Sequence, residues 1–375
     1  MTTITTAFFV LLGCIYLLPF NTLINLYDYY DKVIFRENTT AITPMTFITY
    51  LNSAFQASSL LLNLLVLFIN LPTGGQCLST IHALAVITSS LLLVLICVAG
   101  LLLEAKHYIY ISCVLASLLS TSQSLFDTST LLLASTNKNV LAYACGINLS
   151  GTAHASIYLL LLYIAGAGQN VKELNSIGPT YLAVTAAMVS LGLFARLLNS
   201  NNNNNNNRSI TGGGAAAEQR RVDSTSLFYA IHVCINFTIT LTVYPQLMLR
   251  PDMRPLFNGA AVYLNFNASA LVGNLIAFFF PISSKLYLAL GLGVRALICV
   301  LYFFILTHLH VNIIFHVCTI SFAGLSSAYR ASCDFFGANL LANKTHALRI
   351  VNVGLSLGLM TGSLIAYATV YLRPW

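Results

Sequence analysis

Amide and carboxylate side chains stand at helical spacing inside long apolar runs of this sequence. In the run 13–32, Asn21, Asn25 and Asp28 occupy positions i, i+4 and i+7, which share one face of a helix. Pro19, just before them, removes a backbone hydrogen bond and would kink a helix. Such a face can line a path for a solute that forms hydrogen bonds, or it can join neighbouring helices.

Ionic side chains also lie well inside the apolar runs, at Asp127, Arg295, Arg330 and Asp334. A charge at the centre of a bilayer costs roughly 2.5–3.5 kcal/mol, so each of them is by default a functional-site candidate. Arg330 and Asp334 are four residues apart, and we expect them to pair on one helix face. That pair is either structural or part of a solute path. Asp127 follows Gln123 by four residues, and we expect it to face a cavity.

Neutral polar residues inside the runs are open to two interpretations. Histidine can carry protons near neutral pH, or it can hydrogen-bond to a neighbouring helix. Asparagine can contact a solute or join helices. Amides and hydroxyls with few net charges suit a cavity for a polar, uncharged solute, whereas an ion pathway would need more charge. The residues concerned are His154, His232, His316, Asn148, Asn236, Asn265, Asn267 and Asn274.

The segments that carry these residues are predicted to be membrane-spanning helices. Charged residues are 7% and hydrophobic residues 57% of the 375 residues, whereas a soluble domain has about 25% charged residues. A span needs about 20 apolar residues, and continuous runs of that length predict helices rather than the alternating strands of a barrel. The sequence predicts eleven spans, at 7–27, 47–71, 81–103, 108–135, 140–166, 176–198, 226–248, 257–281, 285–307, 311–340 and 348–371.

A polar, low-complexity stretch divides these spans into two blocks. Residues 199–225 contain an asparagine run and cannot bury a core, so we predict a disordered cytoplasmic linker there. It separates a six-helix block, residues 1–198, from a five-helix block, residues 226–375. The arginines of the linker and a glycosylation sequon at Asn38 favour a cytoplasmic N-terminus. An odd number of spans then places the C-terminus outside.

Other patterns exclude several classes of function. None of the nine cysteines stands in a CxxC or Cys/His ligand pattern, so we interpret them as small buried hydrophobic residues. No basic run suggests nucleic acid as a partner. No nucleophile–base pair, metal-ligand set or phosphate loop appears. We therefore expect neither an enzyme nor a cofactor.

Small residues recur every four positions near the end of the chain, at Gly354, Gly358 and Gly362. Such a stripe lets two helices approach closely. We therefore expect close helix packing here, which is compatible with the rocking of helices in a transporter.

Several stretches together resemble the equilibrative nucleoside transporter family. The first helix of that family contains a Leu-Pro-Trp-Asn signature, and this chain has Leu18-Pro19-Phe20-Asn21. On this resemblance Phe20 or a nearby tyrosine offers a face on which a flat base can stack. The motifs occur in the order of the family and cover nearly the whole chain. The other matching stretches are 124–135, 146–151, 234–247, 264–274, Arg295 and 356–367.

The sequence departs from the family in its eighth span. Where the family carries an aspartate and an arginine, this chain has Ala270 and Asn274. In the family that charged pair is implicated in substrate handling near the ribose. The loss of both partners leaves no buried charge unpaired. Either this protein recognises its solute differently or another pair substitutes, with Arg330 and Asp334 as the first candidates and Asp127 as a third.

The resemblance implies an all-α, polytopic membrane protein of about eleven transmembrane helices, similar to the major-facilitator architecture with six helices plus five. It implies facilitative transport of nucleosides and/or nucleobases by alternating access, with the solute path between the blocks. The alternatives are proton-coupled symport, or a diverged family member with another substrate or no transport. The expected protein is a monomer in the lipid bilayer of the plasma membrane, with protons as a further partner in the symport alternative. The residues expected to bind the solute are Phe20, Asn21, Asn25, Gln123, Asp127, Asn267, Asn274, Arg330 and Asp334.

Overall fold

Helices form all of the regular structure in the part of the chain that is described. The computed structural model describes residues 3–35, 43–69, 75–164, 178–190, 223–244, 259–308 and 313–372. Most of the predicted linker and the sequon at Asn38 lie outside the described residues, as does the side chain of Asp28. The helices are α1 (Thr3–Asn25), α2 (Tyr27–Tyr29), η1 (Tyr30–Ile34), α3 (Pro44–Phe68), α4 (Gly75–Leu102), α5 (Ala105–Thr136), α6 (Val140–Ile164), α8 (Ser224–Val243), α9 (Gly259–Phe279), α10 (Lys285–His308), α11 (Ile313–Asn339) and α12 (Lys344–Leu372).

Nine of the described helices are long and apolar enough to cross a membrane: α1, α3 to α6, α8 to α10 and α12. Helix α11 is 27 residues long but carries polar residues that include Arg330 and Asp334. Residues 178–190 are also helical and cover part of the predicted span 176–198. Each predicted span therefore coincides with a described helix, and the chain is a multi-pass integral membrane protein.

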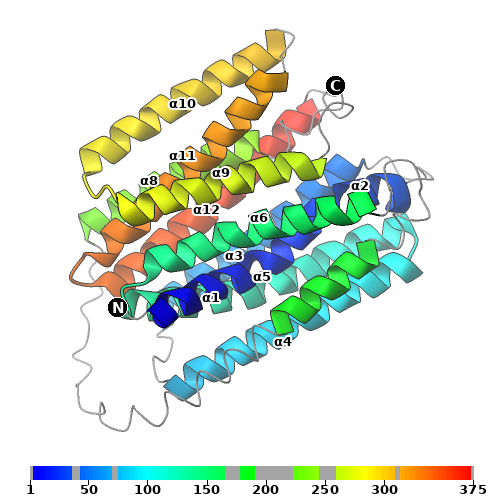
Figure 1. The fold of residues 1–375 in the computed structure, drawn as a ribbon, viewed down its shortest axis with the longest axis horizontal. Helices are drawn as coiled ribbons and strands as arrows, with labels where there is room; N and C mark the ends of the chain where they lie inside the picture. The colour runs from blue at the N-terminus through cyan, green and yellow to red at the C-terminus, as the bar shows by residue number, and fades with distance from the viewer. Residues whose placement is uncertain are drawn as a thin grey trace.

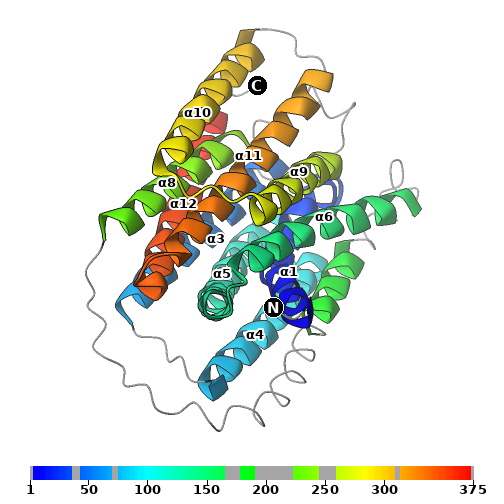
Figure 2. The same ribbon diagram turned by 60° about the vertical axis from the view of Figure 1, so that its left-hand side comes forward.

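The long helices run side by side in one bundle (Figure 1). Helix α1 begins at one end of the bundle and α12 ends at the other. Helices α4 and α10 lie at opposite edges in both views, and α1, α5, α6, α9 and α12 lie between them (Figures 1 and 2). The middle of the bundle is therefore formed by helices from both halves of the chain.

The helices pack both within and between the two predicted blocks. In the first block α1 packs on α6, and α3 and α4 pack on α5. In the second block α8 packs on α12 and α9 on α11. Two further pairs, α6 with α9 and α3 with α12, connect one block to the other. The assignment of the blocks as separate domains stays a prediction.

A short turn aligns α5 with α6. Lys138 has a φ of 57°, a left-handed conformation that is uncommon for a residue other than glycine. The side-chain amide of Asn137 donates to the backbone carbonyl of Leu133 at 2.9 Å, and the backbone N–H of Asn139 donates to Ala134 at 2.7 Å. These contacts close the end of α5 and reverse the chain, so that residues of α5 and α6 can face each other.

The small-residue stripe predicted from the sequence forms a helix contact. A Cβ atom added to Gly354 would meet the backbone of Ala230, and one added to Gly358 would meet the backbone of Cys234. Both contacts would be to backbone atoms of α8, which cannot move aside as a flexible side chain can. The prediction of close packing is confirmed, because α12 lies on α8 at a distance that only glycine allows.

We expect Gly358→Ala to destabilise the protein by roughly 1–3 kcal/mol, because the added methyl group forces α12 away from α8. The matched control is Gly293→Ala in α10, where a Cβ atom would meet nothing within 4 Å. The control should be neutral or slightly stabilising, since alanine favours the helix. Thermal unfolding of the two purified variants in detergent measures the difference, and equal midpoints would contradict the close contact.

Candidate functional site

A cavity of about 210 Å³ lies where the two blocks meet. Its walls come from α1, α3, α5 and α6 of the first block and from α8, α9, α11 and α12 of the second. Most of the lining side chains are apolar or aromatic, and a few polar groups lie among them. An apolar cavity with a few placed polar groups is the usual form of a small-molecule site.

Amide side chains supply the neutral polar groups of this cavity. The side-chain nitrogen of Asn21 donates to Ser150 at 3.5 Å, and that of Asn267 donates to the Tyr263 carbonyl at 2.9 Å. Each amide nitrogen has a second N–H, so one donor and the carbonyl oxygen of each residue are left for a solute. Asn148 also lines the cavity, and among the described residues no hydrogen bond of its side chain is found. The cavity thus offers both donors and acceptors, and one uncommitted amide.

Asp127 is the one acidic residue in the described cavity wall, which holds no lysine or arginine. The hydroxyl of Tyr143 donates to its Oδ1 at 2.6 Å, and the Nδ2 of Asn352 donates to its Oδ2 at 3.1 Å. Hydrogen bonds of this kind stabilise a carboxylate without a cation. Since Tyr143 is on α6 and Asn352 on α12, the carboxylate also links the two blocks. The expectation that Asp127 faces a cavity is confirmed.

Asn274 replaces a charged residue of the resembled family with a satisfied amide. Its Nδ2 donates to the carbonyl of Ala144 at 2.6 Å, and its Oδ1 accepts from the hydroxyl of Ser332 at 2.9 Å. The residue thus connects α9 with α6 and α11 at the cavity wall. Ala270, at the other substituted position, lines the same wall. No charge is stranded at either position.

Two aromatic pairs line the cavity from opposite blocks. Phe20 and Phe55 have ring centroids 4.5 Å apart, on α1 and α3. Tyr244 and Phe266 are stacked, with centroids 3.7 Å apart and planes 9° apart. The hydroxyl of Tyr244 is buried without a hydrogen-bond partner among the described residues. These rings give the cavity flat apolar faces and one more free polar group.

Asn25 and Gln123, both predicted to bind solute, lie outside the cavity wall. The Nδ2 of Asn25 is 3.5 Å from the hydroxyl of Tyr181 in the helical segment 178–190. The Nε2 of Gln123 donates at 2.7 Å to the carbonyl of Tyr16, in the turn before the proline of α1. Both amides therefore join helices, and Gln123 supports the backbone where the proline disturbs it.

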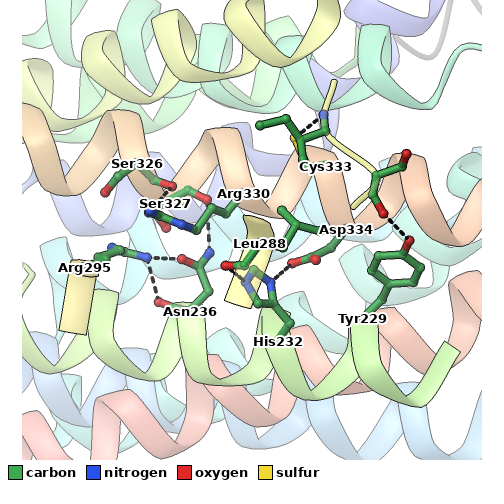
Figure 3. A network of polar contacts seen from close by, with 12 residues as sticks. Tyr229, His232, Asn236, Leu288, Arg295, Ser326, Ser327, Arg330, Cys333 and Asp334 are labelled. Carbon is green, nitrogen blue, oxygen red and sulfur yellow. Dashed lines mark hydrogen bonds and ion pairs between the residues drawn. The ribbon is translucent and has the colours of Figure 1, made fainter. Parts of the chain in front are cut away.

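The prediction that Arg330 and Asp334 form an ion pair is wrong, because the two side chains have other partners in this structure. Oδ2 of Asp334 lies 2.7 Å from Nδ1 of His232 on α8 (Figure 3). Arg330 instead donates to the carbonyl of Gly291 on α10 at 2.5 Å and to that of Ser326 at 3.3 Å. The long arginine side chain extends to a neighbouring helix, and the carboxylate contacts a histidine on another helix instead. Neither residue lines the cavity.

Arg295, for which the sequence suggested no partner, is fully buried beside this network. Its guanidinium donates to the backbone carbonyl and the side-chain oxygen of Asn236 (Figure 3). It also donates to the hydroxyl of Thr240 at 2.6 Å. No carboxylate pairs with it among the described residues. Because Thr240 lines the cavity, the arginine supports that wall from behind.

The other histidines predicted to lie in spans join helices through hydroxyl groups. Nε2 of His154 lies 2.7 Å from the hydroxyl of Thr22 and 2.8 Å from that of Thr185. Nδ1 of His316 lies 2.8 Å from the hydroxyl of Tyr302. Within the described residues no cluster of histidine, cysteine and acidic side chains could hold a metal ion.

Several cavity residues were not singled out from the sequence. They are polar or aromatic residues in predicted spans, but they have no spacing that marks them. For Asn352 a signal was present, because a lone asparagine in an apolar run beside a glycine stripe needs a partner. The cavity residues concerned are Tyr143, Gln56 and Asn352.

The comparisons with known proteins concern the fold. No protein-family model and no curated protein matches the chain. Among solved structures, the chain is similar to a mutant form of the nucleoside transporter NupG, with a TM-score of 0.58 and 10% sequence identity over 98% of this chain and 92% of that chain. At this identity the likeness concerns the fold alone, and it confirms the predicted all-α architecture of the major-facilitator kind.

We expect Tyr143→Phe to destabilise the protein by about 1–3 kcal/mol, because it leaves one oxygen of the buried Asp127 without a donor. In an Asp127→Asn background the same change should cost less, since no carboxylate then needs the hydroxyl. Thermal unfolding of the two single variants and the double variant gives the coupling energy. Tyr110→Phe, at a side chain that is 64% exposed, is the control. Additive effects would contradict the contact.

Proposed function

We propose that this chain carries nucleosides and/or nucleobases across a membrane by alternating access between its two blocks. The observation that carries the proposal is the cavity at the junction of the blocks, with stacked aromatic rings and amide groups in its wall. Flat rings suit a base, and amide oxygens suit the hydroxyl and amino groups of a nucleoside. The likeness of the fold to that of a nucleoside transporter supports the same proposal.

The charge of the cavity favours a neutral solute. The described wall holds one carboxylate and no cationic side chain. A nucleotide would bring a phosphate into a cavity that repels it, because like charges in a medium of low polarity repel strongly. The proposed solutes therefore exclude phosphorylated nucleosides.

Five of the residues predicted to bind solute remain our candidates for direct contact, because they line the cavity. The other four, Asn25, Gln123, Arg330 and Asp334, are assigned to holding helices around it. Asn148 and the hydroxyl of Tyr244 join the contact set as polar groups that the described residues leave unpaired. The five retained residues are Phe20, Asn21, Asp127, Asn267 and Asn274.

Alternating access requires contacts between the blocks that can break and form again. One such contact is that of Asn352 with Asp127, and another is the Nδ2 of Asn63 with the hydroxyl of Ser356 at 2.7 Å. A neutral hydrogen bond such as that of Asn63 contributes only about 0.5–1.5 kcal/mol net, and a bond to a carboxylate such as that of Asp127 about 1.5–3 kcal/mol, because water can replace the partner. Water entering an opening cavity could take over these bonds.

The remaining parts of the proposal concern location and state. We propose a monomer in the plasma membrane, with a cytoplasmic N-terminus and an extracellular C-terminus. The two driving forces considered from the sequence are the solute gradient alone and a proton gradient, and in both cases the solute passes through this cavity. The contrasting proposal is a diverged protein that carries another solute or none.

Uptake in cells that lack nucleoside and base transport tests the function. We expect saturable uptake of labelled adenosine, uridine or hypoxanthine and none of uridine monophosphate, because the cavity wall is acidic. The order of the three solutes identifies the class that is carried. With the protein shown to be in the membrane, the absence of uptake of all three would overturn the proposal, and uptake of the monophosphate would overturn the charge argument.

Asn21 and Asn25 form a matched pair, because the sequence places them on one helix face but only Asn21 lines the cavity. We expect Asn21→Ala to raise the KM for the transported nucleoside about two- to tenfold, the loss of roughly one hydrogen bond. Asn25→Ala should lower the unfolding temperature and leave KM unchanged. Kinetics of both variants after correction for the amount of protein decide this, and the reverse pattern would exclude Asn21 from the site.

A further inference from the structure

The contact between His232 and Asp334 lies outside the cavity and takes no part in the proposed solute site. Both side chains are buried, with exposed fractions of 2% and 0%. It is the one ion pair found within the described residues. The two residues come from α8 and α11, and a third helix, α10, contributes the carbonyl of Leu288 beside the ring (Figure 3).

The positions of the ring nitrogens fix the number of protons in this pair. Nε2 of His232 lies 3.0 Å from the carbonyl oxygen of Leu288, which can only accept, so Nε2 carries a proton. Nδ1 lies 2.7 Å from Oδ2 of Asp334, so this contact needs a proton too, on either the nitrogen or the oxygen. The pair as seen therefore holds two protons and has no net charge.

Removal of one proton makes this arrangement unfavourable. A neutral imidazole beside an ionised carboxylate has only one N–H for two acceptors. If the proton stays on Nε2, a lone pair of Nδ1 faces the carboxylate of Asp334. If it moves to Nδ1, a lone pair of Nε2 faces the carbonyl of Leu288. The observed geometry is therefore that of a proton-loaded pair, and the unloaded pair must change its contacts.

The same helix offers the unloaded carboxylate another partner. Oδ1 of Asp334 is buried and has no hydrogen-bond partner among the described residues. Arg330 lies one turn earlier on α11 and bonds only to backbone carbonyls there and on α10. Once the proton leaves, attraction between opposite charges four residues apart favours a turn of Asp334 from His232 toward Arg330. This change of partner would break the side-chain contact of Asp334 on α11 with His232 on α8.

The helices held by this pair also form part of the cavity wall. On α11, Phe335 follows Asp334 directly and Ser332 lies two residues before it, and both line the cavity. One turn along α8 from His232, the Nδ2 of Asn236 donates to the carbonyl of Ser327 at 3.0 Å. A change in the contact between α8 and α11 would therefore displace residues of the cavity wall.

No other acidic side chain is found against the pair in the described residues. Tyr229, one turn before His232, donates to the carbonyl of Ser283 at 3.2 Å. Phe228 stacks on the His232 ring and separates it from Lys285. Further titratable and charged groups on the packed helices include Cys234 on α8, Arg295, Cys299 and Tyr302 on α10, His316, Tyr329, Arg330 and Cys333 on α11, and Lys344, His346 and Arg349 at the start of α12.

We propose that His232 and Asp334 form the binding site of a proton that is exchanged once in each transport cycle and thereby couples solute transport to a proton gradient. The coupling part of this inference rests on the proposed transport function. The proton site itself is inferred from the carboxylate of Asp334 and the carbonyl of Leu288, two acceptors that face one imidazole. One proton enters the pair from one side of the membrane, where it forms an N–H or O–H bond, and leaves to the other side when that bond breaks; no other covalent bond changes.

Purified protein in liposomes, with a pH-sensitive dye trapped inside, tests the coupling. We expect added uridine, or whichever of adenosine and hypoxanthine is carried, to acidify the interior. A gradient of one pH unit, acidic outside, should accumulate the solute up to about tenfold, since one unit corresponds to 1.36 kcal/mol per proton. Solute transport by the unaltered protein without any proton movement would overturn the proposal.

Asp334→Asn separates coupling from a merely structural role. The amide of this variant can donate to Nδ1 of a neutral His232, so it imitates the loaded pair and preserves the packing. We expect it to retain exchange of labelled for unlabelled solute but to lose acidification and accumulation. His154→Gln, at a buried histidine that bonds only to threonine hydroxyls, is the control and should keep both. Coupling that persists in Asp334→Asn would exclude the pair as the proton site.

A second readout does not depend on transport. The ring ¹⁵N signals of His232, assigned by their loss in His232→Gln, should shift as the pH of the purified protein is raised, and should stay constant in Asp334→Asn. Signals of the unaltered protein that do not move between pH 5 and pH 9 would overturn the proton site. If no solute is carried, the proposed function fails, and this titration still decides whether the pair exchanges a proton.

Discussion

Inside a bilayer no water is available to complete the hydrogen bonds of a polar group, so each amide, hydroxyl or charge in a span must find its partner within the protein. Most of the described polar side chains do so. Asn25, Gln123 and Asn274 each reach a neighbouring helix. Among the groups that do not, the side chain of Asn148 and the hydroxyl of Tyr244 belong to residues of the cavity wall, whereas Ser112 Oγ and Asp334 Oδ1 lie outside it. The two in the cavity wall are candidates for bonds to a hydrogen-bonding solute.

The same constraint separates the two buried aspartates. Asp127 accepts from the neutral donors Tyr143 and Asn352, and this environment is complete for an ionised carboxylate. Asp334 faces a histidine ring whose other nitrogen is already committed to a carbonyl, so its contact with the ring forms only when an extra proton is present. One carboxylate is therefore suited to a fixed charge in a cavity wall, and the other to a charge that appears and disappears.

The sequence was sufficient for the spans, because continuous apolar length sets them, and for the cavity position of Asp127. It could not separate Asn21 from Asn25, since equal spacing on one helix does not reveal which neighbour covers each turn. Nor could it reject a bond between Arg330 and Asp334. The spacing of four residues permits that bond, but the histidine that replaces it is 102 positions away in the chain. Contacts between distant helices depend on which faces meet, and one helix's periodicity does not contain that information.

Two kinds of helix contact in this fold have different consequences for motion. Helix α12 packs on α8 at glycines, whose positions leave no room for a methyl group. The two helices therefore cannot come closer at this contact. Against the first block the same helix uses side-chain amides and hydroxyls, as in the 2.7 Å bond of Asn63 to Ser356. Such bonds can be exchanged for water at little net cost. On one side this helix is tightly packed, and on the other its hydrogen bonds can be exchanged for water. We therefore expect it to move with its own block, as alternating access requires.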